Sequence, residues 1–306
     1  MIETLPATRT LDIEYLGRKR YIACCLLEGN DPVIVDPGPT VSLPRLEAGL
    51  RAVGMALEDL AGVLLTHIHL DHAGAAGTIV AHNPRVRVYV HERGARHMIE
   101  PERLLRSAER LYGDQMDTLW GEFLAVPEGN VHALTGGETL TLAGRRIEVA
   151  YTPGHASHHV SYLDDSTGTA FVGDTTGIRI DGHPFVLPVT PPPDIDLAAW
   201  ESSLRKIEAW RPRHLYLTHF GPAAGVPEHL EQFRSRLQQW ASTVREGLAS
   251  AHDDEARIEA FTAGVLDDLD ARLPPEVGTL YRQGGAPDLS WHGLARYWRK
   301  KAEVDA

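Results

Sequence analysis

Three histidines and an aspartate lie within six positions of the segment LLTHIHLDH, directly after a short apolar run. His67 and His69 are two positions apart, so an extended backbone directs both imidazoles to the same side. Asp71 and His72 follow where the chain turns toward a predicted helix. Imidazole nitrogens and carboxylate oxygens are the ligands that proteins offer to zinc, iron and manganese. The cluster therefore predicts a metal site rather than a packing motif.

Three further donors follow apolar, strand-like segments later in the chain. His155 follows IEVAYTPG, Asp174 follows TAFVG, and His219 follows HLYLT. The ends of sheet strands are where α/β folds place their binding sites. Because one short motif cannot close a coordination sphere, we predict that these three side chains meet the first cluster.

The order of THIHLDH, TPGH, GD and TH, at these separations, resembles the metallo-β-lactamase superfamily over about residues 10–222. The resemblance implies an αββα sandwich with two metal ions in a cleft at the sheet edges. It also implies a set of ligands: His67, His69 and His155 for the first metal, Asp71, His72 and His219 for the second, and Asp174 for both. Asp36, in VIVDPG, matches an early aspartate beneath the metals, although an aspartate before Pro-Gly also suits a plain turn.

The motifs are closest to those of the glyoxalase II-like, binuclear metallohydrolase branch. Class B β-lactamases lack the bridging aspartate that Asp174 would supply, so hydrolysis of antibiotics is not expected. The departure from glyoxalase II is at Ile68 and Leu70, because many of those enzymes carry HHHWDH. Lactonases and phosphodiesterases share the same central motifs. His158 and His159 are expected beside the ligands rather than among them.

The resemblance implies an enzyme with two divalent metal ions, with zinc as the first choice and iron or manganese as alternatives. Asp71 and Asp174 are then the catalytic residues that hold the metals. The ions outweigh these two carboxylates and a bridging hydroxide in charge, so the cleft should attract a small anionic or carbonyl-containing substrate. We expect hydrolysis of an ester, thioester or lactone by a metal-bridging hydroxide. A mononuclear iron persulfide dioxygenase and a phosphodiesterase of the same superfamily stay open as alternatives.

The elements that must position these donors follow an α/β pattern. Strand-like and helix-like segments alternate over the first ninety residues, strands resume near residue 138, and the chain beyond residue 225 reads as helical. We therefore expect a catalytic domain over residues 1–224, a helical cap inserted at about 93–130, and a helical C-terminal extension over 225–306. The cap carries side chains suited to an anionic or aromatic substrate tail: Arg96, His97, Arg103, Arg106, Tyr112 and Trp120.

The composition sets limits on partners and location. A net charge of −12 argues against a broad basic surface, so no nucleic-acid partner is expected. The N-terminal segment has no signal-like pattern, and no apolar run approaches the ~20 residues that span a bilayer. We therefore expect a cytoplasmic protein without a membrane partner. Cys24 and Cys25 are neighbours on a predicted strand, so their side chains should point to opposite faces and make a poor disulfide pair.

Overall fold

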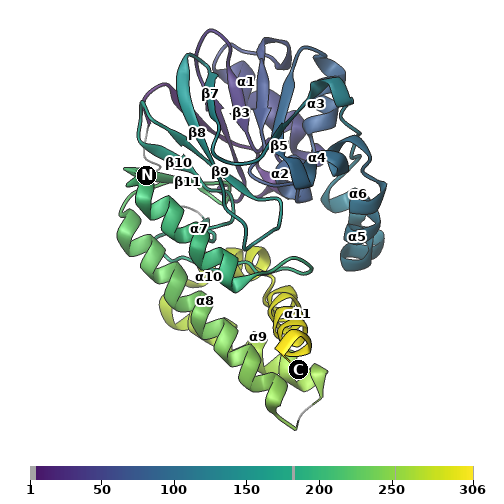
Figure 1. Cartoon of the computed structure of the whole chain (residues 1–306), viewed down its shortest axis with the longest axis vertical. Coiled ribbons are helices and arrows are strands. Elements are labelled where there is room, and N and C mark those ends of the chain that lie inside the picture. Colours follow the sequence, from purple (N-terminus) through teal and green to yellow (C-terminus); the bar gives the residue numbers. More distant parts are fainter. Residues whose placement is uncertain (1–4, 181–182, 252, 306) are drawn as a thin grey trace.

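Two six-stranded sheets form the centre of the protein (Figure 1). The computed structural model describes residues 5–180, 183–251 and 253–305. The first sheet has the order β1-β2-β3-β4-β5-β6, with β1 Thr8–Asp12, β2 Ala23–Leu27, β3 Val33–Val35, β4 Gly62–Leu64, β5 Arg87–His91 and β6 Val131–Leu134. The second has the order β12-β11-β10-β9-β8-β7, with β7 Thr139–Leu142, β8 Arg145–Tyr151, β9 Val160–Asp164, β10 Thr169–Phe171, β11 His214–Leu217 and β12 Gly221–Ala223.

The direction of the strands brings several carboxyl ends to one edge. In the first sheet, β3, β4, β5 and β6 run parallel. Their connections include α1 (Leu43–Ala52), α2 (Leu70–Ala73) and α3 (Ala76–His82). In the second sheet, β10 runs parallel to β11. Strand β8 runs in the same direction as β10, because both are antiparallel to β9. The segments after β8, β10 and β11 therefore leave the second sheet on the same side.

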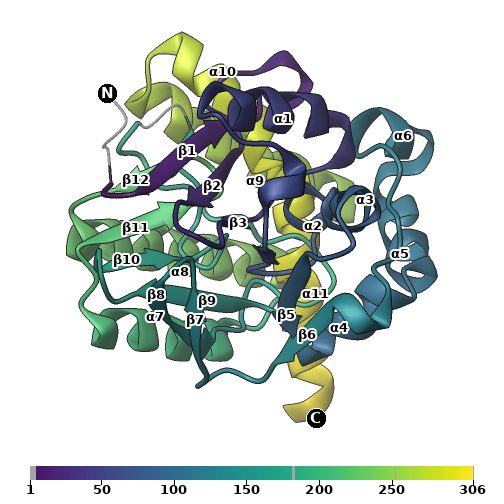
Figure 2. The ribbon, with the colours of Figure 1, turned by 90° about the horizontal axis from the view of Figure 1, so that it is seen from above.

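Alternating side chains of the strands fill two cores. Cys25, Val35 and Phe171 belong to the core between the sheets. Cys24 belongs to the outer core beneath the helices, as expected for neighbouring strand residues, and both thiols are buried and free. Figure 2 shows α1 and α3 over the outer face of the first sheet and α7 (Leu197–Trp210) and α8 (Val226–Ala249) over that of the second. This is the predicted αββα sandwich.

A helical segment separates β5 from β6. It consists of α4 (Glu92–Ile99), α5 (Glu102–Tyr112) and α6 (Met116–Leu119), where the sequence predicts helices. Strand β6 was not predicted, and neither were β1 and β12. All three lie at sheet edges or next to a long connection, and none has more than five residues, which leaves little hydrophobic alternation to detect.

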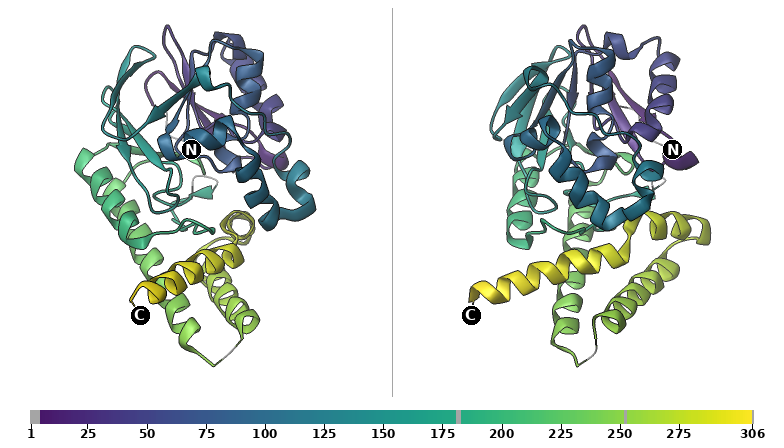
Figure 3. Two further views of the ribbon diagram at one scale, coloured as in Figure 1. Left: turned by 45° about the vertical axis from the view of Figure 1, so that its right-hand side comes forward. Right: turned by 90° about the vertical axis from the view of Figure 1, so that its right-hand side faces the viewer.

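The C-terminal part of the described chain is helical, with α8 followed by α9 (Asp254–Arg272), α10 (Pro275–Gly285) and α11 (Pro287–Asp305). Figure 3 shows α10 and α11 running beneath the sandwich, on the side where α5 and α6 also project. Phe233 of α8 packs on Trp200 of α7 with ring centroids 5.4 Å apart, so these helices share the outer core of the second sheet. Within the described residues, no helix is both long and apolar enough to cross a membrane.

Candidate metal centre

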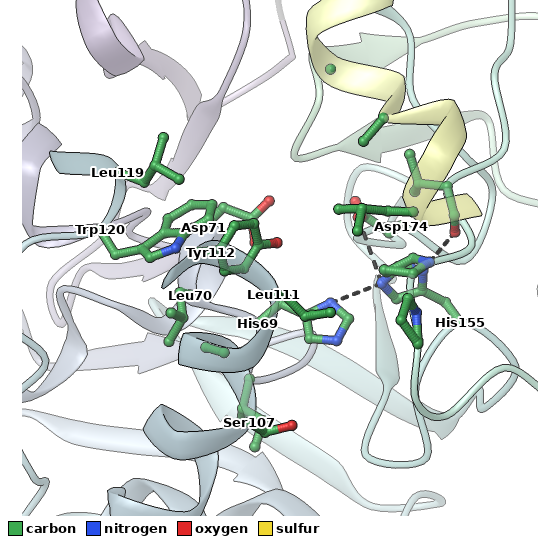
Figure 4. A pocket seen from close by; sticks show the side chains of 18 of the residues that line it. His69, Leu70, Asp71, Ser107, Leu111, Tyr112, Leu119, Trp120, His155 and Asp174 are labelled. Carbon is green, nitrogen blue, oxygen red and sulfur yellow. Dashed lines mark hydrogen bonds and ion pairs between the residues drawn. The ribbon is translucent and has the colours of Figure 1, made fainter. Parts of the chain in front are cut away.

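All seven predicted donors meet at the edge where the strands end. The segment after β4 supplies four of them, and the segments after β8, β10 and β11 supply one each. Among the described residues, three groups of side chains have ligand atoms within 4.8 Å of one another: His67, His69 and His155; His67, His72 and Asp174; and Asp71, His72 and His219. Figure 4 shows His69, Asp71, His155 and Asp174 directed into one volume.

The first group brings three imidazole nitrogens together. Nδ1 of His69 lies 2.9 Å from Nε2 of His67 and 3.0 Å from Nε2 of His155. Nitrogen ligands about 2.0–2.1 Å from a tetrahedral ion are themselves about 3.3 Å apart, so this spacing fits a shared cation closely. The donor chemistry and the spacing of this group therefore suit a divalent metal ion.

Asp174 stands between the first group and the other donors. Its Oδ2 lies 3.7 Å from Nε2 of His155, whereas its Oδ1 lies 3.5 Å from Nε2 of His72 and 3.9 Å from Nε2 of His219. Oδ1 of Asp174 and Nε2 of His72 are buried and have no hydrogen-bond partner within the described part of the chain. Buried polar atoms are normally satisfied, so two such atoms facing one another suit a cation between them. The second set of donors therefore also fits a metal ion.

Hydrogen bonds on the outer side of the rings fix the histidine tautomers. Nδ1 of His155 donates to the carbonyl of Val189 at 2.9 Å, and Nδ1 of His219 donates to the carbonyl of Tyr21 at 3.1 Å. Nδ1 of His72 lies 2.8 Å from the carboxylate of Asp36. These acceptors have no proton to give, so Nδ1 carries the proton in each ring. In His155, the lone pair of Nε2 is then free to face the shared volume, because burial lowers the pKa of the ring. In His72 and His219, Asp174 outweighs burial and raises the pKa, so a metal ion would displace a proton from Nε2 of these two rings.

Asp36 lies beneath the donors and accepts several hydrogen bonds. Its Oδ1 accepts from the backbone N–H of Thr66 at 2.8 Å, and its Oδ2 accepts from the hydroxyls of Thr66 and Thr218, each at 2.7 Å. These threonines directly precede His67 and His219, so one carboxylate ties both sheets to the site. Asp36 has a φ of +49°, which aspartate tolerates better than most residues. It is therefore more than a turn residue.

Burial and charge leave the first group neutral and the carboxylates ionised. Burial, followed by the neighbouring His155, lowers the pKa of His69 to about 3. Burial alone would raise the pKa of Asp71, but His72 and His219 outweigh it and lower the pKa to about 2. Burial likewise opposes ionisation of Asp174, but His72 and His219 hold its pKa below the usual range. Neutral imidazoles and ionised carboxylates are the forms that bind metals.

His158 and His159 lie beside the donors, as the sequence predicts, and belong to none of the three groups. The backbone N–H of Ile68 donates to Nδ1 of His158 at 3.4 Å, and the hydroxyls of Thr152 and Thr175 lie 3.0 Å from Nδ1 of His159. Through these hydrogen bonds, the two rings help to hold the chain segments that carry the predicted donors.

A cavity of about 850 Å³ opens over the donors. The inserted helices line part of it, including four of the six residues that were singled out from the sequence: His97, Arg103, Tyr112 and Trp120. The prediction is wrong for Arg96 and Arg106, which do not line the cavity. Arg96 instead pairs with Glu100, one helical turn away on the exposed surface, at 3.1 Å.

Other parts of the cavity wall were not predicted from the sequence. Tyr15, Leu16 and Tyr21 come from the connection between β1 and β2, and Leu289 and Ser290 come from the start of α11. Nothing in their local patterns marks a binding site. By contrast, Thr66 and Thr218 share the dipeptide Thr-His, a repetition that was visible in the sequence.

Comparison with known proteins agrees with this geometry. The chain is 31% identical over 185 residues to the metallo-beta-lactamase fold-containing protein ST1585 of Sulfurisphaera tokodaii, a match that covers 59% of this chain and 69% of that protein. The solved structure of ST1585 superimposes with a TM-score of 0.65 at 23% identity, covering 94% of this chain and 98% of that one. At this identity, the structural likeness shows the fold.

Two relatives carry enzyme names. A hydroxyacylglutathione hydrolase of Pseudoalteromonas translucida is 26% identical over 288 residues, which is 90% of this chain and 93% of that protein. An atrochrysone carboxyl ACP thioesterase of Aspergillus fumigatus is 24% identical over 70% of this chain, and the match spans 57% of the thioesterase.

The family model for the metallo-beta-lactamase superfamily matches residues 18–219. That range contains the seven donors and every strand of both sheets except β1 and β12, which each lie at one edge of a sheet. Most members of this family are hydrolytic enzymes, and the family uses divalent metals. The chain belongs to the metallo-β-lactamase superfamily.

Proposed function

We propose that this protein is a binuclear metallohydrolase that cleaves an ester, thioester or lactone. The observation that carries the proposal is the position of Asp174, whose two carboxylate oxygens face different donors. Oδ2 faces His155 of the first group, and Oδ1 faces His72 and His219. A carboxylate in this position suits a bridge between two cations, and such a pair suits hydrolysis.

In this proposal, His67, His69 and His155 would hold the first metal, Asp71, His72 and His219 would hold the second, and Asp174 would serve both. When bound, a pair of divalent cations supplies Lewis acidity that polarises a carbonyl group and activates water near neutral pH. Zinc is the first choice, because imidazole and carboxylate ligands suit it, and iron and manganese accept the same donors.

The chain's own residues prepare the site for this chemistry. Val189, Tyr21 and Asp36 hold the Nδ1 protons of His155, His219 and His72, so Nε2 is the ring nitrogen that is aimed inward. Because the histidine side chains are largely withdrawn from water, few solvent molecules compete for the donors. The inserted helices and the C-terminal helices restrict access from the open side.

The named relatives favour a thioester over the other substrates. Both the hydroxyacylglutathione hydrolase and the ACP thioesterase are named for cleaving an acyl group from a thiol carrier. We also propose that residues 1–224 are the catalytic unit, that the segment at about 93–130 caps its cleft, and that residues 225–306 complete the wall.

Two measurements on the full chain test the proposal. Elemental analysis after reconstitution with zinc should give two ions per chain, and Asp174→Asn should reduce that number. A panel of an ester, a thioester, a lactone and a phosphodiester should show metal-dependent cleavage, fastest for the thioester. One ion per chain, or oxygen consumption with a persulfide substrate in place of hydrolysis, would overturn the two-metal hydrolase.

A further inference from the structure

A row of aromatic rings leads away from the second set of donors. Tyr21 meets the ring of His219 edge-on, with centroids 6.0 Å apart. Tyr15 stacks on Tyr21 at 5.9 Å, Trp120 stacks on Tyr15 at 5.9 Å, and Tyr112 meets Trp120 edge-on at 5.1 Å. All four aromatic residues line the cavity. The row joins the connection between β1 and β2 to the inserted helices, so the two segments form one continuous apolar wall.

Two exposed leucines extend this wall to the surface. Leu16 is 41% exposed and Leu111 is 38% exposed, and each directly neighbours an aromatic residue of the row. Four large hydrophobic residues are exposed in the described part of the chain, and these two line the cavity. Exposed apolar side chains at the rim of a binding site indicate an apolar ligand that reaches the rim.

Positive and negative side chains of the inserted helices are distributed unequally between the cavity and the outer surface. Helices α4 and α5 contain five arginines and three glutamates. Arg93, Arg103 and Arg110 line the cavity, whereas none of the three glutamates does. Among the described residues, no acidic side chain forms an ion pair with Arg93 or Arg103 (Arg93 lies over the ring of Tyr151, at 5.9 Å). These two guanidinium groups are therefore available to a ligand.

The part of the cavity wall that carries Arg93 and Arg103 lies on the side of the first donor group. Tyr151, next to Arg93, ends the strand that leads to His155, and its hydroxyl donates to the carbonyl of Ser157 at 2.9 Å. Outside the metal-site aspartates, Asp194 is the one described acidic residue that lines the cavity, against four arginines, of which Arg18 lies over the ring of Tyr21 at 5.5 Å, beside the aromatic row. In a protein with a net charge of −12, this local excess of positive charge favours an anionic group.

We propose that the cavity selects an amphiphilic ester or thioester, with an extended apolar group on one side of the scissile bond and an anionic group on the other. The apolar group lies along the row from Tyr21 to Leu111, and the anion, a carboxylate or a phosphate, binds Arg93 and Arg103. This inference rests on the proposed hydrolysis, because the metal centre lies between the two walls. Arginine suits either anion, since its planar fork donates to two oxygens at once.

Non-hydrolysable thioethers test this selection on the zinc-loaded full chain. The probes are 3-(octylthio)propanoate, its neutral amide 3-(octylthio)propanamide, the short-chain 3-(ethylthio)propanoate, and 2-(octylthio)ethylphosphonate, with Kd measured by calorimetry. The octyl acid should bind more tightly than the amide and than the ethyl acid. Replacing Arg93 and Arg103 together by glutamine should weaken binding of the octyl anions by about tenfold or more and change binding of the amide little. The stronger of the two octyl anions identifies the anionic group.

Matched variants separate specific contacts from general charge and hydrophobicity. Replacing Arg96 and Arg106 together by glutamine removes the same charge from the same two helices outside the cavity, and should leave all Kd values unchanged. Leu111→Asn should reduce the advantage of octyl over ethyl, whereas Val53→Asn, at an exposed site away from the cavity, should not. Equal binding of the octyl acid and amide to the parent protein, or equal weakening of both by the arginine variants, would overturn the proposal. Because the probes are not cleaved, this result is independent of whether the hydrolysis panel succeeds.

Discussion

The carboxylate of Asp36 and the imidazole of His72 form a buried pair, with Oδ2 and Nδ1 2.8 Å apart. Neither side chain is more than 1% exposed. The same carboxylate receives hydrogen bonds from both threonines that precede a predicted ligand, one from each sheet. Orientation of the second metal's ligands thus depends on a residue that touches no metal in our proposal.

Asp36→Asn should weaken the second metal site. Asparagine keeps the size of the side chain and tolerates the positive φ, but it offers one acceptor oxygen in place of two and no charge. Loss of such an outer partner typically costs about 10–100-fold in metal affinity. Zinc competition titrations should show this loss for one of two ions. Asp31→Asn, at an exposed position in the preceding turn, is the control, and two wild-type affinities in the Asp36 variant would contradict the role.

His219→Ala and Asp71→Ala distinguish a two-metal hydrolase from a single-iron dioxygenase. Both residues belong to the proposed second site, so each variant should bind fewer metal ions and lose about 10²-fold or more in turnover. A single iron held by the remaining donors would instead survive both changes. Metal content and turnover are measured together, with His82→Ala at an exposed position as the control. Full metal content and full activity in both variants would exclude the two-metal hydrolase.

The candidate metal ligands could be predicted from the sequence because each is marked by its own residue type. His67, His69 and His72 stand in one short motif, and Asp174 and His219 each follow an apolar strand. The parallel direction of β8, β10 and β11 then brings these strand ends together, which is why the predicted convergence holds.

The partners of those ligands could not be predicted in the same way. Val189 and Tyr21 act through backbone carbonyls, and a carbonyl acceptor has no residue signature. The cavity wall depends on contacts between distant segments, such as Tyr15 against Trp120, which no local periodicity encodes. The contribution of α11 to the wall likewise depends on how the C-terminal helices dock beneath the sandwich.

Gly293→Ala tests whether α11 positions a metal ligand. A Cβ at this position would lie 1.9 Å from the carbonyl oxygen of Thr190, so the loop that includes Val189 must shift. Because the carbonyl of Val189 holds His155, zinc affinity at the first site should fall, and the free energy of unfolding should fall by about 1–3 kcal/mol. Titration with zinc and urea unfolding measure the two effects.

The matched control for that variant is Gly264→Ala on α9, where a Cβ would meet nothing within 4 Å. In a helix interior, this change alone should stabilise by up to about 1 kcal/mol. The same Gly→Ala change should thus lower the free energy of unfolding at position 293 and raise it at position 264. Unchanged zinc affinity in the Gly293 variant would show that the loop does not depend on α11.

His229 should make the fold sensitive to acid independently of the metal ligands. It lies buried on α8, where Nε2 donates to the carbonyl of Thr176 at 2.9 Å and Nδ1 has no hydrogen-bond partner among the described residues. Burial, opposed by the hydrogen bond to Thr176 and assisted by the nearby Arg179, lowers its pKa to about 4. Protonation would add a buried N–H without an acceptor.

Because the folded pKa of His229 is below the unfolded value of about 6.5, the unfolded chain binds more protons between these two values. The contribution of neutral His229 is complete above about pH 6.5 and is lost as the pH falls toward 4, by about 3 kcal/mol in all. His229→Gln should lower the free energy of unfolding at pH 7.5 but flatten its decline between pH 6.5 and 4.5, as measured by urea unfolding. The exposed His82→Gln should keep the parent slope, since the ligand histidines titrate equally in all three proteins. Parallel curves for the parent and the His229 variant would show that acid sensitivity arises elsewhere.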